Sequence, residues 1–144
     1  MEGTQVDGLR LLVVDDEEDF RETVVKRMVK RHVIAQGAES GEKALEWLAD
    51  NEVDVVVLDV RMPGMDGIQA LQEIKRRYPL VEVVMLTGHA SMELAIEGME
   101  LGAFDYLMKP IEMDALLYKI QDAHKKKSIQ EAKIRGMEGV AGSR

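Results

Sequence analysis

Carboxylate, hydroxyl and ammonium side chains directly follow short apolar runs at four places in the sequence. Asp15 and Asp16 follow LLVV, Asp59 follows VVVL, Thr87 follows VVML, and Lys109 follows YLM. Runs of this kind are typical of strands that are buried on both faces, as in a parallel sheet. If such strands carry these residues, their carboxyl ends meet at one edge of the sheet, where open α/β folds bind ligands.

Three carboxylates in one cleft would repel one another and raise each other's pKa unless a cation joined them. The chain has no cysteine, and neither His32 nor His124 is placed as a ligand. An all-oxygen donor set favours a hard ion such as Mg²⁺ over Zn²⁺. A metal, an ammonium from Lys109 and a hydroxyl from Thr87 would suit a phosphoryl group, with Asp59 as the nucleophile.

Each of these residues also has an ordinary structural explanation. The acidic run DDEED at 15–19 would suit the first turn of a helix, where negative charge is favourable. Asp59 could simply end a strand at the surface, and Thr87 or Lys109 taken alone is more often structural. Only their joint placement at four strand ends favours a chemical site.

Apolar runs alternate with amphipathic stretches along the chain, which predicts alternating strands and helices. Gly37 is expected to break the chain after the second strand, and Phe104 and Tyr106 to face the same side of the fifth. Five strands alternating with five helices predict an α/β fold, a doubly wound five-stranded parallel sheet with helices on both faces. Strands are predicted at 9–16, 32–36, 54–59, 81–87 and 104–109, and helices at 17–31, 40–51, 68–78, 91–102 and 111–127.

Four motifs together resemble the receiver domain, the phospho-acceptor module of bacterial two-component response regulators. They are LLVVDDEED, VVVLDVRMPGMDG, VVMLTGHA and GAFDYLMKP, in that order. The resemblance implies the flavodoxin-like strand order 2-1-3-4-5. It also implies a receiver domain at 8–127, followed by a C-terminal extension at 128–144 that is partly helical or disordered.

The resemblance implies how the phosphoryl group and the metal are held. Asp59 would accept the phosphoryl group from a phosphohistidine on a sensor histidine kinase or a phosphotransfer protein. Asp16 would bind Mg²⁺, or Mn²⁺ in its place, directly, and Asp15 would help through water. The backbone carbonyl of Arg61 and a carboxylate oxygen of Asp59 would complete the protein ligands.

The resemblance further implies a switch. Lys109 would pair with the phosphoryl oxygens, Thr87 would move to hydrogen-bond the group, and Tyr106 would turn inward behind it. The Lys109–Pro110 peptide bond is expected to be cis. The face formed by the fourth helix, fifth strand and fifth helix would then change for a downstream protein or output domain.

Two positions that vary within the family that this sequence resembles suggest control of the lifetime of the phosphoryl group. Arg61 and His89 each lie two residues after a site residue, Asp59 and Thr87. Our hypothesis is that their side chains control how water reaches the acyl phosphate. The alternative is that both side chains face solvent and have no effect.

The function expected is that of a signalling phosphoprotein that catalyses its own phosphotransfer and slow dephosphorylation, rather than of an enzyme with a separate substrate. One alternative is a magnesium-dependent phosphohydrolase with an aspartyl nucleophile. Such enzymes usually have a second carboxylate two residues after the nucleophile, where this chain has Arg61. Another alternative is a receiver-like binding module that is never phosphorylated, but such modules tend to lose an acid or the lysine.

Length and charge set further expectations. A chain of 144 residues suggests one domain, and its net charge of −8 disfavours direct nucleic acid binding. No apolar run reaches the ~18 residues of a membrane span, and the start lacks the pattern of a signal peptide. We expect a cytoplasmic protein, as a monomer or weak dimer. A final helix unbroken over 111–135 would be about 37 Å long and would project.

Overall fold

The computed structural model describes residues 8–89 and 91–142, in which strands and helices alternate. Residues 1–7, on which the signal-peptide expectation depends, lie outside the described residues, as do 143–144 of the predicted extension. The strands are β1 (Arg10–Val14), β2 (Ile34–Ala38), β3 (Val55–Leu58), β4 (Glu82–Thr87) and β5 (Asp105–Met108). The helices are α1 (Glu18–Val29), α2 (Gly41–Asp50), α3 (Gly67–Arg77), α4 (Met92–Glu100) and α5 (Met113–Gly142).

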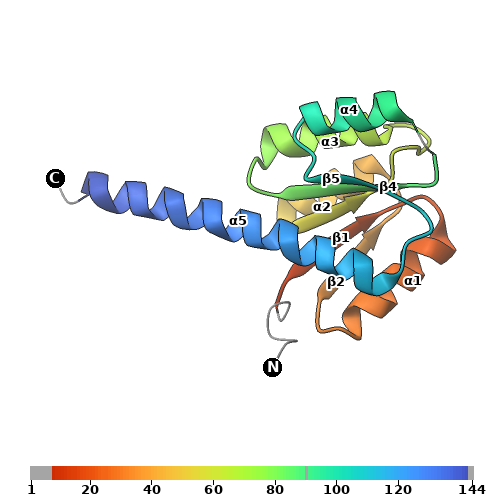
Figure 1. The fold of residues 1–144 in the computed structure, drawn as a ribbon, viewed down its shortest axis with the longest axis horizontal. Coiled ribbons are helices and arrows are strands. Elements are labelled where there is room, and N and C mark those ends of the chain that lie inside the picture. The colour runs from red at the N-terminus through yellow and green to blue at the C-terminus, as the bar shows by residue number, and fades with distance from the viewer. Residues whose placement is uncertain (1–7, 90, 143–144) are drawn as a thin grey trace.

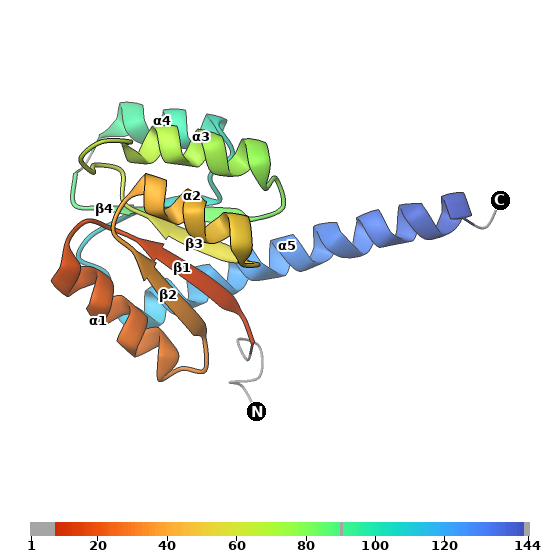
Figure 2. The ribbon, with the colours of Figure 1, turned by 180° about the vertical axis from the view of Figure 1, so that it is seen from behind.

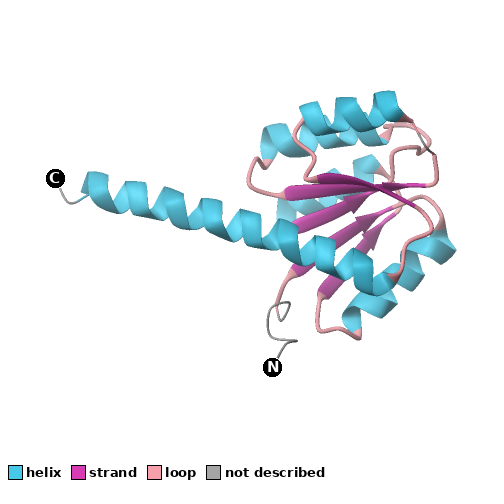
Figure 3. Ribbon diagram, in the orientation of Figure 1, coloured by secondary structure: helices cyan, strands magenta, loops and turns pink. Residues whose placement is uncertain are grey.

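The five strands form one parallel sheet in the order β2-β1-β3-β4-β5. Helices α2, α3 and α4 cover one face of the sheet, and α1 and α5 cover the other (Figures 1 and 2). Figure 3 shows the strands as the central layer between these helices. The predicted fold and strand order are therefore confirmed.

The central strands are buried because both of their faces are covered. Leu12, Val56 and Val83 lie in register on neighbouring strands and pack under α2, α3 and α4. The residues that follow each of them in sequence belong to the second core, under α1 and α5. This strict alternation explains why continuous apolar runs were needed in β1, β3 and β4.

The edge strand β2 differs from the prediction. His32, expected to begin the strand, lies in a turn with φ of 70°, and Gly37, expected to break it, lies within the strand. Because β2 pairs only with β1, it need not be apolar on both faces, and Ile34 is 60% exposed. Ser40 caps α2 by accepting a hydrogen bond from the Lys43 N–H, at 3.1 Å.

Phe104 and Tyr106 lie on opposite faces of the sheet, so the expectation that they share one face was wrong. Phe104 packs with the core under α1 and α5, whereas Tyr106 packs with the core under α2, α3 and α4. The reason is that β5 begins at Asp105. Phe104 precedes the strand, so the two-residue alternation does not reach it.

Helix α5 has two parts. Leu116, Ile120 and Ala123 are completely buried against the sheet, and Lys127 is the last buried residue of the helix within 113–137, the part whose burial is described. The helix then continues to Gly142, about 22 Å beyond Lys127 at 1.5 Å per residue, and projects from the body (Figure 1). The extension expected at 128–144 to be partly helical or disordered is thus helical as far as it is described. None of the described helices has the length and apolarity needed to cross a membrane.

Candidate functional site

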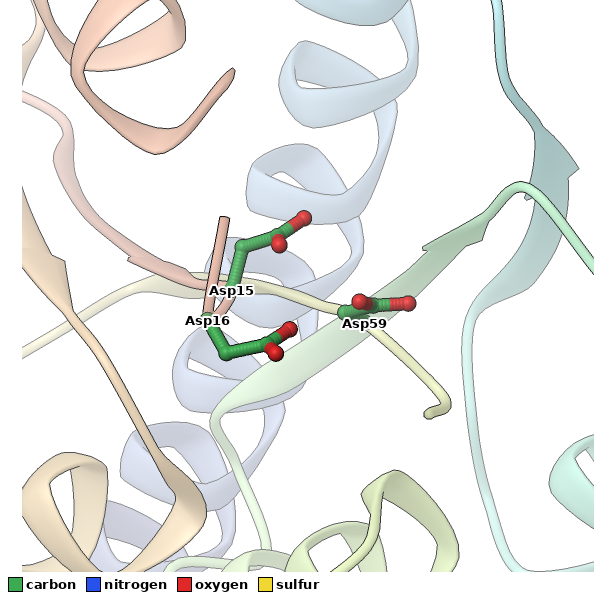
Figure 4. A group of neighbouring side chains, drawn as sticks. All are labelled: Asp15, Asp16 and Asp59. Atoms are coloured by element: carbon green, nitrogen blue, oxygen red, sulfur yellow. The ribbon is translucent and has the colours of Figure 1, made fainter. Parts of the chain in front are cut away.

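Three carboxylates meet at the carboxyl ends of β1 and β3. The Asp59 N–H donates to the Val14 carbonyl at 2.9 Å, and the Asp15 N–H donates to the Ala38 carbonyl at 3.1 Å, so the sheet hydrogen bonding reaches both residues. One carboxylate oxygen each from Asp15, Asp16 and Asp59 lies within 4.8 Å of the other two. Figure 4 shows Asp15 and Asp16 together, with Asp59 beside them on the neighbouring segment.

This donor set fits a hard divalent cation. Asp15 and Asp59 are buried and Asp16 is exposed, so an ion there would have protein oxygens on one side and water on the other, as Mg²⁺ prefers. Burial raises the pKa of Asp59, and the negative charge of Asp15 raises it further. A cation between these groups would relieve the same repulsion.

Lys109 provides the positive charge beside this cluster. Its ammonium donates to Asp15 Oδ2 at 2.9 Å and to Glu17 Oε1 at 3.0 Å, and it lies 4.1 Å from the centre of the Phe20 ring. Burial alone would lower the pKa of Lys109, but the hydrogen bonds to Asp15 and Glu17 outweigh it and raise that pKa. Lys109 is thus held by Asp15 and Glu17 rather than by Asp59.

Thr87 and Tyr106 are joined through the backbone of His89. The Thr87 hydroxyl accepts a hydrogen bond from the His89 N–H at 3.1 Å, and the Tyr106 hydroxyl donates to the His89 carbonyl at 3.0 Å. Thr87 is completely buried, whereas the His89 side chain is exposed. Between them, a Cβ on Gly88 would meet nothing within 4 Å, so the backbone next to Thr87 borders open space.

The loop after Asp59 is fixed against the start of α3. Asp66 accepts from the Gln69 N–H at 2.9 Å and forms a capping box with that residue. The Gly67 N–H donates to the Val60 carbonyl at 2.7 Å. A Cβ on Gly67 would collide with the Asp59 carbonyl oxygen, so only glycine permits this close approach.

The remaining predicted residues surround this cluster. The Arg61 N–H lies 3.4 Å from Asp59 Oδ1, and the Arg61 side chain is exposed. Lys109 follows β5, its N–H donates to the Thr87 carbonyl at 2.8 Å, and the Lys109–Pro110 bond is cis. The chemical roles assigned to these residues stay predictions.

Two residues of this site were missed by the sequence reasoning. Glu17 binds Lys109 and also donates its N–H to Asp15 Oδ1 at 2.9 Å. Arg21 donates from Nη1 to the Asp15 carbonyl at 2.8 Å. Glu17 lay within the acidic run that was explained as a helix start, and Arg21 fell on the polar face of a predicted helix, so neither was assigned a role.

Comparison with known proteins agrees with this architecture. The family model of the response regulator receiver domain matches residues 11–121. The Regulatory protein AtoC of Escherichia coli (strain K12) is 39% identical over 127 residues, which cover 85% of this chain and 26% of that protein. The DNA-binding transcriptional regulator NtrC of the same strain is 36% identical over 111 residues, covering 77% and 24%.

A solved structure gives the same result at the level of the fold. The response regulator receiver domain protein from Clostridium thermocellum is 32% identical, has a TM-score of 0.80, and is matched over 85% of this chain and 98% of that one.

The chain spans about a quarter of the length of the curated relatives it matches, at 26% and 24%. One of these relatives is named as a DNA-binding regulator. The expectation of no nucleic acid partner is therefore not supported for a longer protein that contains this chain. The match over residues 11–121 covers most of the chain, and the chain therefore belongs to the response regulator receiver domain family.

Proposed function

We propose that Asp59 accepts a phosphoryl group from a phosphohistidine on a sensor histidine kinase or phosphotransfer protein. Phosphoryl acceptance is the general function of receiver domains, and the observation that supports it in this chain is the cluster at the strand ends. Asp15, Asp16 and Asp59 place their oxygens within 4.8 Å of one another, with the Lys109 ammonium bound to the edge of the cluster. The excess of negative charge there calls for a cation.

Each side chain has a part in the transfer. A carboxylate oxygen of Asp59 attacks the phosphorus atom, the P–N bond to the donor imidazole breaks, and the acyl phosphate forms. Asp15, Asp16, Asp59 and the Arg61 carbonyl would hold Mg²⁺ or Mn²⁺, which supplies charge neutralisation at the phosphoryl oxygens. Lys109 adds an ammonium to the same oxygens after it releases Glu17, its exposed partner at 3.0 Å.

The switch starts from Thr87. When the Thr87 hydroxyl turns to the phosphoryl group, the His89 N–H loses the acceptor that it has at 3.1 Å. The same residue holds the Tyr106 hydroxyl through its carbonyl, so the β4–α4 loop and the tyrosine ring would move together. This coupling supports a change at the face of α4, β5 and α5.

That face is suited to a protein partner or output domain. It exposes large apolar side chains, each more than a third accessible, from all three of its elements. They are Met92, Ile96, Met99, Met108 and Tyr118. Truncating Ile96 and Met99 to Ala should weaken binding of the output partner while leaving phosphorylation of Asp59 intact. Loss of phosphorylation together with partner binding would contradict this assignment.

The lifetime hypothesis remains part of the proposal. The side chains of Arg61 and His89 are exposed and follow the strand ends that carry Asp59 and Thr87, which is the geometry needed to influence the approach of water. Replacing both with Ala should change the dephosphorylation rate. An unchanged rate would refute the idea.

Incubation with acetyl phosphate and Mg²⁺, followed by intact mass measurement, tests the function directly. We expect the wild-type protein to gain one phosphoryl mass and Asp59→Asn to gain none. Rapid hydrolysis of the donor without an adduct would instead support a phosphohydrolase. Absence of any reaction, together with failure to accept phosphate from a histidine kinase, would support a module that is never phosphorylated.

The cellular setting belongs to the same proposal. We place the protein in the cytoplasm, where a kinase could reach it, as a monomer or weak dimer. Sedimentation of the metal-bound protein with and without a phosphoryl donor would show whether phosphorylation changes its assembly.

A further inference from the structure

Arg21 contacts the backbone of the acidic cluster from outside. Its stem leaves α1 one turn after Glu17, and its Nη1 donates to the Asp15 carbonyl at 2.8 Å. Within the described part of the chain the Arg21 guanidinium forms no ion pair, and the hydrogen bond to the Asp15 carbonyl holds it in place. The Asp15 carbonyl belongs to the peptide group that joins Asp15 to Asp16. Arg21 therefore bears on the orientation of that peptide group.

The edge strand β2 completes the support. The Asp15 N–H donates to the Ala38 carbonyl at 3.1 Å, so β2 holds one peptide group of Asp15 and Arg21 holds the next. The stem of Arg21 reaches the carbonyl by crossing Gly37. A Cβ at Gly37 would lie 3.1 Å from both Cγ and Cδ of Arg21. The absence of a side chain at Gly37 thus makes the path of Arg21 available.

The side chain of Asp15 is fixed as well. Its Oδ1 accepts from the Glu17 N–H at 2.9 Å, and its Oδ2 accepts from Lys109 at 2.9 Å. With both of its peptide groups and both carboxylate oxygens bound, Asp15 is rigid, and Asp16 follows it on a defined peptide plane. A rigid support of this kind places a metal ligand without touching the metal.

We propose that Arg21, lying across Gly37, is a positioning residue that orients the Asp15–Asp16 peptide group for binding a divalent cation. The inference rests on the proposed function, because it assumes that Asp15 and Asp16 take part in metal binding. It adds a residue outside the cluster and a specific reason for a glycine in the edge strand.

The sign of the effect separates positioning from simple charge. Removing a positive charge near a cation site should, by electrostatics alone, strengthen binding of the cation. If Arg21 orients the site, Arg21→Ala should instead weaken Mg²⁺ binding, by about tenfold, the lower end of the range for residues that support metal ligands. Lys26→Ala is the matched control, because it removes the same charge from an exposed position on the same helix.

The measurement is calorimetric titration of each variant of the 144-residue chain with Mg²⁺, without any phosphoryl donor. A second readout is amide hydrogen exchange at Asp16 and Glu17 in the metal-free protein, which should become faster in Arg21→Ala and stay unchanged in Lys26→Ala. Equal or tighter Mg²⁺ binding by Arg21→Ala than by Lys26→Ala would overturn the proposal.

Gly37→Ala provides an independent check. The added methyl group should displace the Arg21 stem and weaken Mg²⁺ binding in the wild-type background. In the Arg21→Ala background it should have no further effect, because the atoms it would meet are gone. Additive losses in the double variant would contradict the geometry. Formation of the Asp59 adduct by the wild-type protein tests the proposed function separately. If the adduct forms but Arg21→Ala binds Mg²⁺ as tightly as Lys26→Ala does, this inference alone fails.

Discussion

A buried ion pair at the opposite end of the sheet fixes the point where α5 leaves the body. Lys127 donates to Asp54 Oδ1 at 3.0 Å and to Glu131 Oε2 at 2.8 Å. Asp54, just before β3, also accepts from the Arg10 N–H at 2.9 Å and from the Arg10 guanidinium at 3.3 Å. Side chains of Asp54 and Lys127 are only 5% and 10% exposed. Asp54 therefore has two cationic partners and a backbone donor, whereas Lys127 has one buried partner and one on its own helix.

This asymmetry predicts unequal effects of removing either member. Asp54→Ala would leave the Lys127 ammonium and the Arg10 N–H without their buried acceptor, and breaking a buried pair in this way costs about 3–5 kcal/mol. Lys127→Met keeps the apolar stem, and Asp54 keeps Arg10. The loss of the hydrogen bond to Asp54 is then partly offset, because the cost of burying the ammonium is removed with it. We therefore expect the free energy of unfolding to fall by about 1 kcal/mol.

Equilibrium unfolding in urea at pH 7, followed by circular dichroism and by the fluorescence of Trp47, measures these free energies. Lys125→Met is the control, since Lys125 is an exposed lysine on the same helix. The double variant Asp54→Ala with Lys127→Met should be more stable than the sum of the single losses predicts, because it contains no ammonium that has lost its buried acceptor. The reasoning would be refuted if Lys127→Met cost as much as Asp54→Ala.

Three further outcomes follow from the site. The pKa of Asp59 is raised by burial and by Asp15, so the folded state holds its proton up to a higher pH than the unfolded chain does, and ionised Asp59 opposes folding. Asp59→Asn should therefore raise the free energy of unfolding at pH 7, and urea titrations should show this gain shrinking toward about pH 4. Gly67→Ala should destabilise the protein by about 1–3 kcal/mol, because the added methyl group meets the backbone at Asp59. In calorimetric melting, a Tm unchanged from wild type would contradict this contact. Tyr106→Phe removes the hydrogen bond to the His89 carbonyl at 3.0 Å and should cost about 0.5–1.5 kcal/mol. Amide hydrogen exchange should become faster in the β4–α4 loop. A change in exchange only outside this loop would contradict the coupling between Tyr106 and the loop.

The parts of the fold that the sequence predicted are those that burial determines. β1, β3 and β4 have helices on both sides, so only long apolar runs can form them, and such runs are visible in any sequence. β2 and β5 are edge strands whose composition is less restricted. The predicted β2 was displaced by two residues, whereas the predicted bounds of β5 were off by one residue at each end, no more than those of β1 and β3. Phe104 shows the consequence, because a shift of one residue in the start of β5 reversed the face assigned to it.

The site shows a similar division. Asp15, Asp59, Thr87 and Lys109 could be found because each ends a strand, and parallel strands bring their ends together. The contact of Lys109 with Glu17 could not be found, because Glu17 reaches Lys109 across 92 positions of sequence through a side-chain rotamer, and no periodicity encodes that. The domain boundary after 127 and the lifetime residues stay predictions.

The polar clusters at the two ends of the sheet differ in their charge balance. At the amino end, Asp54 is matched by Arg10 and Lys127 within hydrogen-bonding distance, and both cations are accounted for by protein groups. At the carboxyl end, three clustered carboxylates share one lysine, which also serves Glu17. Balanced buried charges can hold a helix in place, but an excess of one sign in a folded protein opposes folding unless something binds there. Since both clusters rest on the same strands, burial cannot explain the difference between them. The imbalance at the carboxyl end is best explained as a requirement for a bound cation, and it is the physical reason to regard that end, rather than the equally polar amino end, as the functional site.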